Sequence, residues 1–319
     1  MQINQFMRFN LLFQLLFVAL GQAGDGEPAE IQFFVRRDQG SNEFIARKGV
    51  LVKRKAAPAT ILLLHGYGID KYMMAPFRLL LKAYNCLTFD FRAHGVHADD
   101  EESTLGYDEV YDVFGAVDFL RSDPDLGQKP IIVVGFSMGA VSAIEAQALD
   151  PSLFMAMFLD TPFSSSLDVL RRGMQDMRFG LWGYEFDLPG RSWIEDYAFN
   201  PYFQPFVQMI LRLKSSLNAS RINTVAKAIA PSESVRKITI PMFLVVTKGD
   251  ERVNVGDVQK VYDNCHGEFK RLWVANGHSH CDAVLYNPEK YEQVLNKFIY
   301  DVLNKTLKSK PKGEIIYDR

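Results

Sequence analysis

Residues 131–140 read I-I-V-V-G-F-S-M-G-A, and this stretch decides the fold more than any other part of the chain. A run of β-branched residues leads to Ser137, which stands between Gly135 and Gly139, and a small-residue helical pattern follows. In a strand–turn–helix of this kind the serine lies at the apex of a strained turn. The glycines are needed because a Cβ at either position would collide as strand and helix approach each other. The stretch therefore predicts a nucleophile elbow.

Apolar runs typical of buried strands recur along the chain and alternate with helical patterns. Expected strands lie at residues 59–64, 85–91, 131–134, 154–159, 242–246 and 269–274, and expected helices at 73–83, 107–120, 255–264 and 288–303, with one more after Ser137. Residues 31–35 and 43–52 mix apolar and polar positions, as antiparallel strands do. The alternation predicts an α/β fold with a mostly parallel central sheet flanked by helices.

The alternation stops between Asp160 and Pro241. This interval is crowded with aromatic residues and then continues with helical segments; the aromatics are Phe179, Trp182, Tyr184, Phe186, Trp193, Tyr197, Phe199, Tyr202, Phe203 and Phe206. We expect a core formed by residues 31–160 and 241–304 and a helical cap insertion at residues 161–240. Most of the aromatics would form the core of the cap, and a minority would line an apolar substrate pocket.

Composition and charge describe an ordinary globular chain. Its 319 residues are 48% hydrophobic and 23% charged, with a net charge of −2, so there is material for a large core and no electrostatic footprint of a nucleic-acid-binding protein. The lysines at 305, 308, 310 and 312 are expected to lie in a solvated tail.

The first residues have the pattern of an export signal. Arg8 precedes an apolar stretch at residues 11–20, and Gly21-Gln22-Ala23 provides small residues for cleavage after Ala23. The apolar stretch, of about ten residues, is too short to span a bilayer. We expect residues 1–23 to be a signal peptide and the protein to be periplasmic or secreted, without stable membrane insertion. An uncleaved membrane anchor and a misassigned start are the alternatives.

Three cysteines are too few for a disulfide framework. Cys86 lies in an apolar strand pattern and is expected to be buried. An oxidising compartment would permit a bridge between Cys265 and Cys281, which their spacing alone does not imply. Two N-x-S/T sequences begin at Asn218 and Asn304 and matter only in a eukaryotic source.

A serine nucleophile needs a general base, and the base needs an orienting acid. In an elbow fold the order along the chain is serine, acid, histidine, each at the end of its own strand. Asp250 follows the strand at 242–246, and His278 and His280 follow the strand at 269–274. Asp250 is the favoured acid, with Glu251 and Asp160 as rivals, and the pattern alone leaves both histidines open.

The expected strand at 59–64 is followed by His65-Gly66-Tyr67-Gly68. A loop at this place can supply one amide of an oxyanion hole, from Tyr67, to pair with the amide of Met138. Asp90, Arg92 and His94 follow the next strand and are interpreted as polar residues that hold their loop.

His278, His280 and Asp282 spell H-x-H-x-D, which in a metallo-β-lactamase-type fold would bind zinc. The sixth position here is Ala283 instead of histidine, and the remaining histidines form no matching pattern. We therefore expect no metal site.

Together, the motifs resemble the α/β-hydrolase superfamily, and within it the bacterial branch of serine aminopeptidase-like and dienelactone-hydrolase-like proteins. The resemblance covers about residues 61–303; its motifs are the His65-Gly66 loop, D-x-R-x-H-G from Asp90, T-L-G-Y-D-E at 104–109, G-F-S-M-G, and D-x-x-V at Asp250. It implies a hydrolase with Ser137, Asp250 and a histidine as its triad and with no cofactor.

The resemblance also selects the histidine, because in such relatives the base lies about seven residues before an N/D-P-E-x-Y helix start. Here that start is Asn287-Pro288-Glu289, and the count leads to His280. Two positions depart from the family pattern, since Ala93 and Thr247 stand where glycine is common.

The expected activity is hydrolysis of a carboxylic ester with an apolar portion, through an acyl-enzyme. A serine aminopeptidase or another amidase is the alternative, because acidic cap residues could hold a substrate amine; these are Glu185, Asp187, Glu195 and Asp196. A hydrolase fold used only for binding is the non-enzymatic alternative. The expected partner is a small acyl substrate and not a nucleic acid.

Overall fold

The computed structural model describes residues 26–98, 100–175, 178–181, 184–187, 197, 199–214, 223–267, 269–309 and 313–318. The predicted signal peptide at residues 1–23 lies outside the described residues, as do several parts of the predicted cap, including Glu195 and Asp196. Among the helices of the described ranges, none has both the length and the apolar character needed to cross a membrane.

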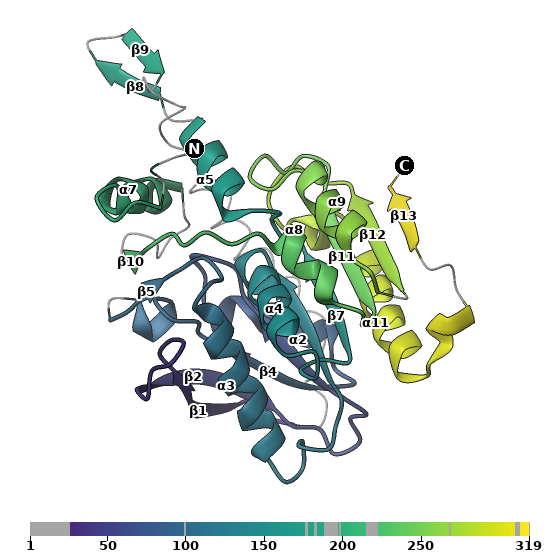
Figure 1. Cartoon of the computed structure of the whole chain (residues 1–319). Helices are drawn as coiled ribbons and strands as arrows, with labels where there is room; N and C mark the ends of the chain where they lie inside the picture. The colour runs from purple at the N-terminus through teal and green to yellow at the C-terminus, as the bar shows by residue number, and fades with distance from the viewer. Residues whose placement is uncertain are drawn as a thin grey trace.

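Nine of the described strands form one twisted sheet (Figure 1). In spatial order they are β1 (Ala29–Arg36), β2 (Phe44–Val52), β4 (Asn85–Phe89), β3 (Thr60–Leu64), β6 (Ile131–Phe136), β7 (Ala156–Asp160), β11 (Met242–Thr247), β12 (Lys270–Ala275) and β13 (Gly313–Tyr317). Strand β2 runs antiparallel to β1 and β4, and the remaining pairs are parallel. The predicted α/β fold with a mostly parallel sheet is confirmed.

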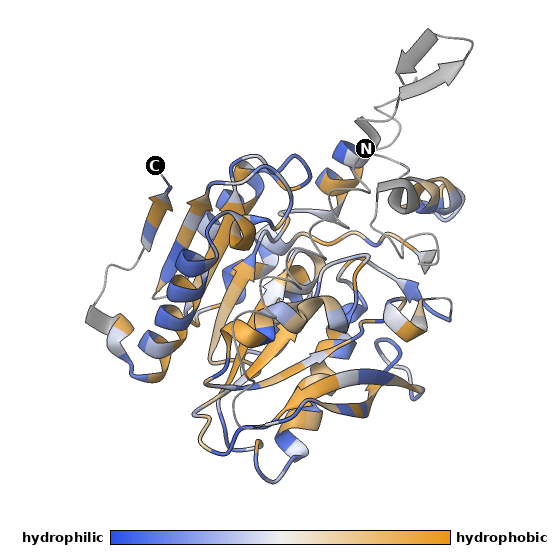
Figure 2. Cartoon of the chain, turned by 180° about the vertical axis from the view of Figure 1, so that it is seen from behind, coloured by the Kyte–Doolittle hydropathy of each residue, from blue (hydrophilic) through white to orange (hydrophobic). Residues whose placement is uncertain are grey.

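Helices cover both faces of the sheet and account for the apolar strand sequences. The longer helices are α3 (Glu109–Ser122), α4 (Met138–Leu149), α9 (Val255–Asn264) and α11 (Pro288–Leu303); the shorter ones are η1 (Lys71–Met74), α2 (Ala75–Leu80), η2 (Gly95–His97), α8 (Pro231–Ser234), η3 (Val235–Lys237), α10 (Ala283–Tyr286) and η4 (Thr306–Ser309). In β3, Leu62 and Leu64 pack in the cluster with α3, α4 and α9, whereas Ile61 and Leu63 pack in the cluster with α2 and α11. Both faces are therefore buried, and Figure 2 shows apolar strands inside helices with polar outer sides.

The order of the strands determines where a site can form. The chain goes from β3 to β4 on one side, and then returns to place β6 on the other side of β3. The loops after β3 and β6 consequently diverge, and the carboxyl ends of strands at such a switch point are where ligands bind in open α/β sheets. Ser137 follows β6 directly, and His65 follows β3.

The described parts of the predicted cap include α5 (Ser166–Gln175), a hairpin of β8 (Arg178–Leu181) and β9 (Tyr184–Asp187), and α7 (Gln204–Lys214). Strand β10 (Asn223–Thr224) pairs in parallel with β5 (Glu102–Ser103). Of the aromatics expected in the cap core, Phe199 and Phe206 pack against a small cluster with Leu170 and Val207, whereas Tyr202 and Phe203 are exposed.

The two ends of the insertion are joined to each other. The amide and the hydroxyl of Ser232 both donate to the carbonyl of Ser164, at 3.2 and 3.0 Å. Beyond these residues, Phe163 and Val235 pack in the main core. Residues at both ends of the predicted 161–240 interval thus belong to the packing of the sheet.

Strand β13 lies beyond the predicted core range of 241–304 and adds an edge strand next to β12. It follows a lysine-rich stretch that the sequence led us to place in solvent. Of those lysines, Lys305 is exposed, and the side chains of Lys308, Lys310 and Lys312 lie outside the described residues. The cysteines are free thiols, with Cys86 and Cys265 buried, so the burial predicted for Cys86 is confirmed.

Candidate active site

The turn after β6 has the strained geometry that its sequence predicts. Ser137 has φ 49° and ψ −114°, a backbone conformation that costs a non-glycine residue free energy. A Cβ on Gly139 would lie 2.5 Å from the carbonyl oxygen of His65, and one on Gly135 would lie 2.8 Å from Cα of Ala140. The Ser137 amide donates to the carbonyl of Asp160 at 2.9 Å. Only glycines at these two positions allow the helix to start so close to the neighbouring strands.

Three predicted residues from three different loops meet at this turn. Nε2 of His280 lies 2.7 Å from Oγ of Ser137, and Nδ1 of His280 lies 2.7 Å from Oδ2 of Asp250. Because an ionised carboxylate only accepts, Nδ1 carries a proton and Nε2 is free to accept the hydroxyl proton. The arrangement is a continuous chain of hydrogen bonds from hydroxyl to imidazole to carboxylate.

The loop after β11 holds Asp250 in place before α9 begins. Its Oδ1 accepts from the amides of Arg252 and Val253, both at 2.9 Å, and the side chain is buried. Burial alone would raise the pKa of Asp250, but the charge and hydrogen bond of His280 and the two amides lower it below the usual value. Asp250 is therefore ionised at neutral pH.

His280 is held between Asp250 and its sequence neighbour Cys281. Burial alone would lower the pKa of His280, but the charge and the hydrogen bond of Asp250 raise it. Because burial raises the pKa of the Cys281 thiol itself, that thiol is uncharged near neutral pH, and the carboxylate of Asp250 is the charge that acts on His280.

The alternatives from the sequence lie in other surroundings. His278 is exposed, and its ring packs edge-on against Tyr286 at 5.0 Å. Oδ2 of Asp282 accepts from the amides of His278 and Ser279 at 3.0 and 2.8 Å, so this carboxylate shapes the histidine loop. No group of three potential metal ligands occurs within the described residues. Glu251 is exposed.

Asp160, the other rival acid, lies at the end of β7 with its side chain fully buried. It accepts hydrogen bonds from the hydroxyls of Tyr291 and Thr161, both at 2.8 Å, and not from His280. Burial raises the pKa of Asp160 to about 6, against the lowering effect of these two hydrogen bonds. Its carbonyl, not its carboxyl, contacts the serine turn.

The loop after β3 runs beside Ser137. A methyl group on Gly66 would lie 3.5 Å from Cβ of Ser137. His65 anchors the loop, because its Nδ1 donates to the carbonyl of Gly66 at 2.7 Å while its Nε2 accepts from the amide of Phe91 at 3.1 Å. The hydroxyl of Tyr67 pairs with that of Thr224 on β10 at 2.5 Å. Met138 begins α4, where a backbone amide has no acceptor within the helix.

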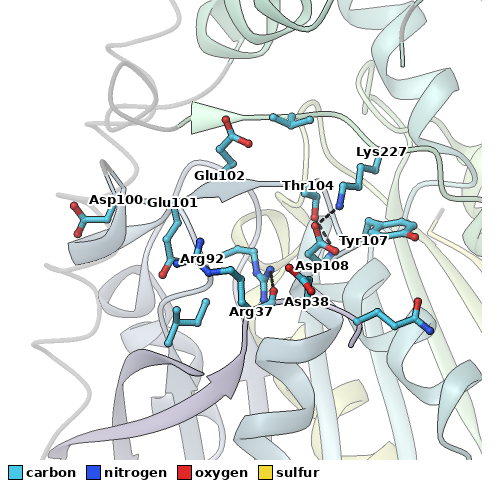
Figure 3. A pocket seen from close by; sticks show the side chains of 13 residues that line it. Arg37, Asp38, Arg92, Asp100, Glu101, Glu102, Thr104, Tyr107, Asp108 and Lys227 are labelled. Carbon is cyan, nitrogen blue, oxygen red and sulfur yellow. Dashed lines mark hydrogen bonds and ion pairs between the residues drawn. The ribbon is translucent and has the colours of Figure 1, made fainter. Parts of the chain in front are cut away.

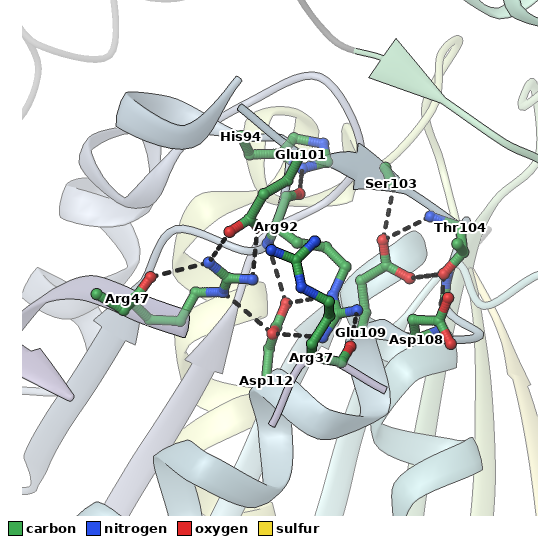
Figure 4. Close-up of polar contacts among 12 residues, drawn as sticks. Arg37, Arg47, Arg92, His94, Glu101, Ser103, Thr104, Asp108, Glu109 and Asp112 are labelled. Carbon is green, nitrogen blue, oxygen red and sulfur yellow. Dashed lines mark hydrogen bonds and ion pairs between the residues drawn. The ribbon is translucent and has the colours of Figure 1, made fainter. Parts of the chain in front are cut away.

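Asp90 and Arg92, which follow β4, form ion pairs, and Figure 4 shows the contacts of Arg92 and Arg47 with Asp112. Asp90 pairs with Lys71 at 2.7 Å, and Asp112 pairs with Arg92 at 2.9 Å and with Arg47 at 3.0 Å. His94 is buried, and burial together with His65 lowers its pKa to about 4, so it is neutral. Ala93 has φ 58°, which explains why a glycine is common at this position.

A polar cavity of about 660 Å³ lies next to the β1–β2 hairpin (Figure 3). Its three cationic side chains are Arg37, Arg92 and Lys227, and each forms an ion pair within the protein, with Glu43, Asp112 and Asp108 respectively. Ser137, His280 and Asp250 do not line this cavity. This cavity is separate from the serine turn.

Two residues near the site were not assigned a role from the sequence. Thr247 donates its hydroxyl to the carbonyl of Ser279 at 2.9 Å, which joins the acid loop to the histidine loop. Asp318 follows β13 and accepts from the amide of Asn276 at 3.0 Å. In the sequence, the threonine at position 247, where glycine is common in the family, could have indicated a special role for this residue. No local pattern marks Asp318.

Comparisons with known proteins agree with this architecture. The esterase Pf2001 of Pyrococcus furiosus superposes with a TM-score of 0.65 and 23% identity over 87% of this chain and 93% of that one. An acylaminoacyl peptidase of Pyrococcus horikoshii superposes with a TM-score of 0.59 and 16% identity, over 90% of this chain and 43% of that one. Similarities at this level of identity establish the fold.

Among curated proteins, the uncharacterized protein YqkD of Bacillus subtilis (strain 168) is 24% identical over 267 residues, which are 81% of this chain and 77% of that protein. The family model described as "Alpha/beta hydrolase family" matches residues 61–294, a span that runs from β3 through the serine turn and the acid loop into α11. The chain is thus a member of the alpha/beta hydrolase family.

Proposed function

We propose that the protein is a serine hydrolase that cleaves carboxylic esters through an acyl-enzyme. The observation that carries the proposal is the hydrogen-bonded series Ser137–His280–Asp250, which has 2.7 Å at each link and starts from a serine on a strained turn. Three side chains from separate loops with these contacts match the roles of nucleophile, general base and orienting acid.

In the proposed reaction, Oγ of Ser137 attacks the ester carbonyl while Nε2 of His280 takes the hydroxyl proton. Asp250 holds the tautomer of the imidazole and stabilises the imidazolium that forms. His280 then gives the proton to the leaving alcohol, and the acyl-enzyme remains. A water molecule, deprotonated by His280, attacks the acyl-enzyme and releases the carboxylic acid and the free serine.

The oxyanion of the tetrahedral intermediate is assigned to the amides of Met138 and Tyr67. Support for Met138 is its position at the start of α4, where the helix dipole also favours negative charge. Support for Tyr67 is the passage of its loop next to Ser137, together with the hydrogen bond that His65 makes to the Gly66 carbonyl.

For the substrate, we favour an ester over an amide. Esterases occur among the similar structures, and the cap has an apolar part in which Phe199 and Phe206 pack with Leu170 and Val207. A serine peptidase or amidase is the second candidate, since an acylaminoacyl peptidase also has this fold. This second candidate agrees with the serine aminopeptidase-like branch suggested by the sequence.

A fluorophosphonate probe tests the nucleophile directly. We expect the wild-type protein to be labelled, Ser137→Ala to show no labelling, and Ser122→Ala to be labelled like wild type, because Ser122 is exposed at the end of α3. A wild-type protein that stays unlabelled under native conditions would contradict the proposal. Comparing p-nitrophenyl esters with aminoacyl-anilides then tests the substrate class; faster anilide cleavage would favour the peptidase.

We also propose that residues 1–23 direct export, on the basis of Arg8 and the apolar stretch at 11–20. Expression of the full chain with N-terminal sequencing of the exported product tests this. A new terminus at Gly24 supports cleavage, whereas an intact Met1 in the membrane fraction would identify an anchor.

A further inference from the structure

Asp318, directly after the edge strand β13, forms hydrogen bonds where the loops after β11 and β12 leave the sheet. Its amide donates to the carbonyl of Val274 at 3.0 Å. Its Oδ1 accepts from Nε1 of Trp273 at 2.9 Å, and its Oδ2 accepts from the amide of Asn276 at 3.0 Å. The carbonyl of Asp318 accepts from Nζ of Lys248 at 2.6 Å. One residue therefore contacts the roots of two different loops.

These two loops carry Asp250 and His280. Lys248 lies two residues before Asp250, Asn276 lies four residues before His280, and the Lys248 ammonium also donates to Oδ1 of Asn276 at 2.8 Å. Further along, the amide of Gly249 donates to the carbonyl of Gly277 at 3.1 Å. The Lys248 amide and the Thr247 hydroxyl also join the two loops, to the carbonyls of Ala275 and Ser279, both at 2.9 Å. Asp318 adds one bond to each loop at the point where the loops begin, from a strand outside both of them.

The Asp318 carboxylate is suited to this position because it is almost enclosed. Its side chain is 10% exposed, and Lys290 on α11 forms an ion pair with it. Burial alone would raise the pKa of Asp318, but the contacts with Lys290, Asn276 and Trp273 lower it, so the group is ionised at neutral pH. Removal of the carboxylate would leave the Trp273 indole and the Asn276 amide without this acceptor.

We propose that Asp318 is a positioning residue for the Ser137 site, and that it maintains the Asp250–His280 contact by holding the acid loop and the histidine loop at a fixed separation. This inference rests on the proposed hydrolase function. It adds to that function a strand, β13, that lies outside the residues matched by the family model.

The same strand provides a matched control. Glu314 forms an ion pair with Arg271 at 2.8 Å, directly across the β12–β13 pairing. Loss of this pair weakens the attachment of β13 without touching either loop. If β13 contributed only to stability, Glu314→Gln and Asp318→Ala would lower kcat to the same extent when they lower the free energy of unfolding to the same extent.

The test compares wild type, Asp318→Ala, Asp318→Asn and Glu314→Gln in the full chain. We expect Asp318→Ala to lower kcat for a p-nitrophenyl ester on the order of 10- to 100-fold, with KM little changed, because small displacements of reacting groups are costly. Asp318→Asn retains one acceptor and should lie between this variant and wild type. Glu314→Gln should retain wild-type kcat.

A second readout is the titration of His280, followed by its imidazole NMR signal and by the acid limb of kcat/KM. The titratable groups that face His280 are Asp250, Cys281 and, from β7, Asp160. Loosening the loops weakens the contact with Asp250, so the midpoint should move to lower pH in Asp318→Ala and stay unchanged in Glu314→Gln. A folded Asp318→Ala variant with wild-type kcat and midpoint would overturn the proposal, and so would an equal loss of kcat in both variants.

If Asp318→Ala does not fold, Lys248→Met removes only the bridge to the Asp318 carbonyl and the Asn276 amide group. It should shift kcat and the His280 midpoint in the same direction by a smaller amount, and no shift would again overturn the proposal. The NMR titration requires no turnover, so it tests Asp318 even if wild type neither hydrolyses esters nor reacts with the probe. An active wild type whose His280 titration is insensitive to Asp318 would refute this inference alone.

Discussion

His280 and Ser137, separated by 143 positions in the sequence, lie with Nε2 2.7 Å from Oγ. The imidazole of His278, only two residues earlier, packs instead against Tyr286 on α10. The two histidines thus share a loop but have different surroundings, which makes them a natural pair for comparison.

We expect His280→Ala to lower kcat/KM by about five to six orders of magnitude, since removing the base from a serine hydrolase costs about as much as removing the serine. His278→Ala should remain close to wild type. Both variants are assayed with the same p-nitrophenyl ester, and circular dichroism verifies their folding. A larger loss in His278→Ala would assign the base to the other histidine.

The raised pKa of His280 predicts the pH dependence of the reaction. The base must be neutral to accept a proton, so kcat/KM should rise with pH and reach half its maximum above pH 6.5. Asp250→Asn removes the charge that raises this pKa, so the midpoint should fall while kcat drops about 10⁴-fold. The groups facing His280 are Asp250, Cys281 and Asp160, and Cys281→Ser should leave the midpoint in place because the thiol is uncharged. A wild-type midpoint below 6.5 would contradict this prediction.

The buried ion pairs around Asp112 predict a large stability effect from a residue outside the Ser137–His280–Asp250 series. Asp112→Ala leaves Arg47 and Arg92 buried without this partner, and we expect a loss of about 3–5 kcal/mol in the free energy of unfolding. Glu43→Gln breaks an exposed pair with Arg37 and should cost less than about 1 kcal/mol. Urea unfolding measures both.

The same carboxylate has a pH signature. Burial alone would raise the pKa of Asp112, but Arg47 and Arg92 lower it below its usual value. A lowered pKa in the folded state means that the stabilisation is present above the unfolded pKa and is lost as pH falls through the folded one. Stability that is equal in wild type and Asp112→Ala at neutral pH would contradict this account.

The serine turn predicts that Gly139 tolerates no side chain. Gly139→Ala would bring a methyl group within 2.7 Å of two backbone carbonyl oxygens, those of Leu64 and His65, which cannot move away as a side chain could. We expect a loss of about 3 kcal/mol in the free energy of unfolding, or a displaced turn with little probe labelling. Gly256→Ala, near the start of α9, meets only the side-chain oxygen of Asn254 at 3.2 Å and should change stability by less than about 1 kcal/mol. Equal thermal unfolding of the two variants would show that the turn is less tightly packed than described.

The local parts of this fold could be predicted because their signals are local. The residues of β3 are all buried, which requires an uninterrupted apolar run. Gly135 is required by its distance to Ala140, five residues along the chain, whereas Gly139 is required by the carbonyls of Leu64 and His65 at the end of the neighbouring strand. The order of serine, acid and histidine along the chain, each after its strand, nominates Ser137 and Asp250 and leaves His278 and His280 open. The resemblance to the α/β-hydrolase superfamily is what selects His280.

The features that could not be predicted depend on pairing between distant segments. Strand β13 has only five residues, and it is ordered by pairing with β12 and by the contacts of Asp318 with Trp273 and Asn276. The two-residue strands β5 and β10 exist because they pair with each other across more than a hundred positions. Such contacts leave no periodicity in a single sequence.

The hydrogen bonds between Ser164 and Ser232 have an evolutionary consequence. The insertion leaves the core and returns to it at one hydrogen-bonded point, so it behaves as a loop whose two ends are held together. The free energy of closing such a loop depends only weakly on its length. Residues 176–222, which lie between α5 and β10, can therefore be shortened, lengthened or exchanged without changing the register of β7 against β11, while β10 and Lys227 keep their contacts with β5 and Asp108. Selection for new substrates can act on this module while the serine turn and its hydrogen-bonding partners are inherited unchanged.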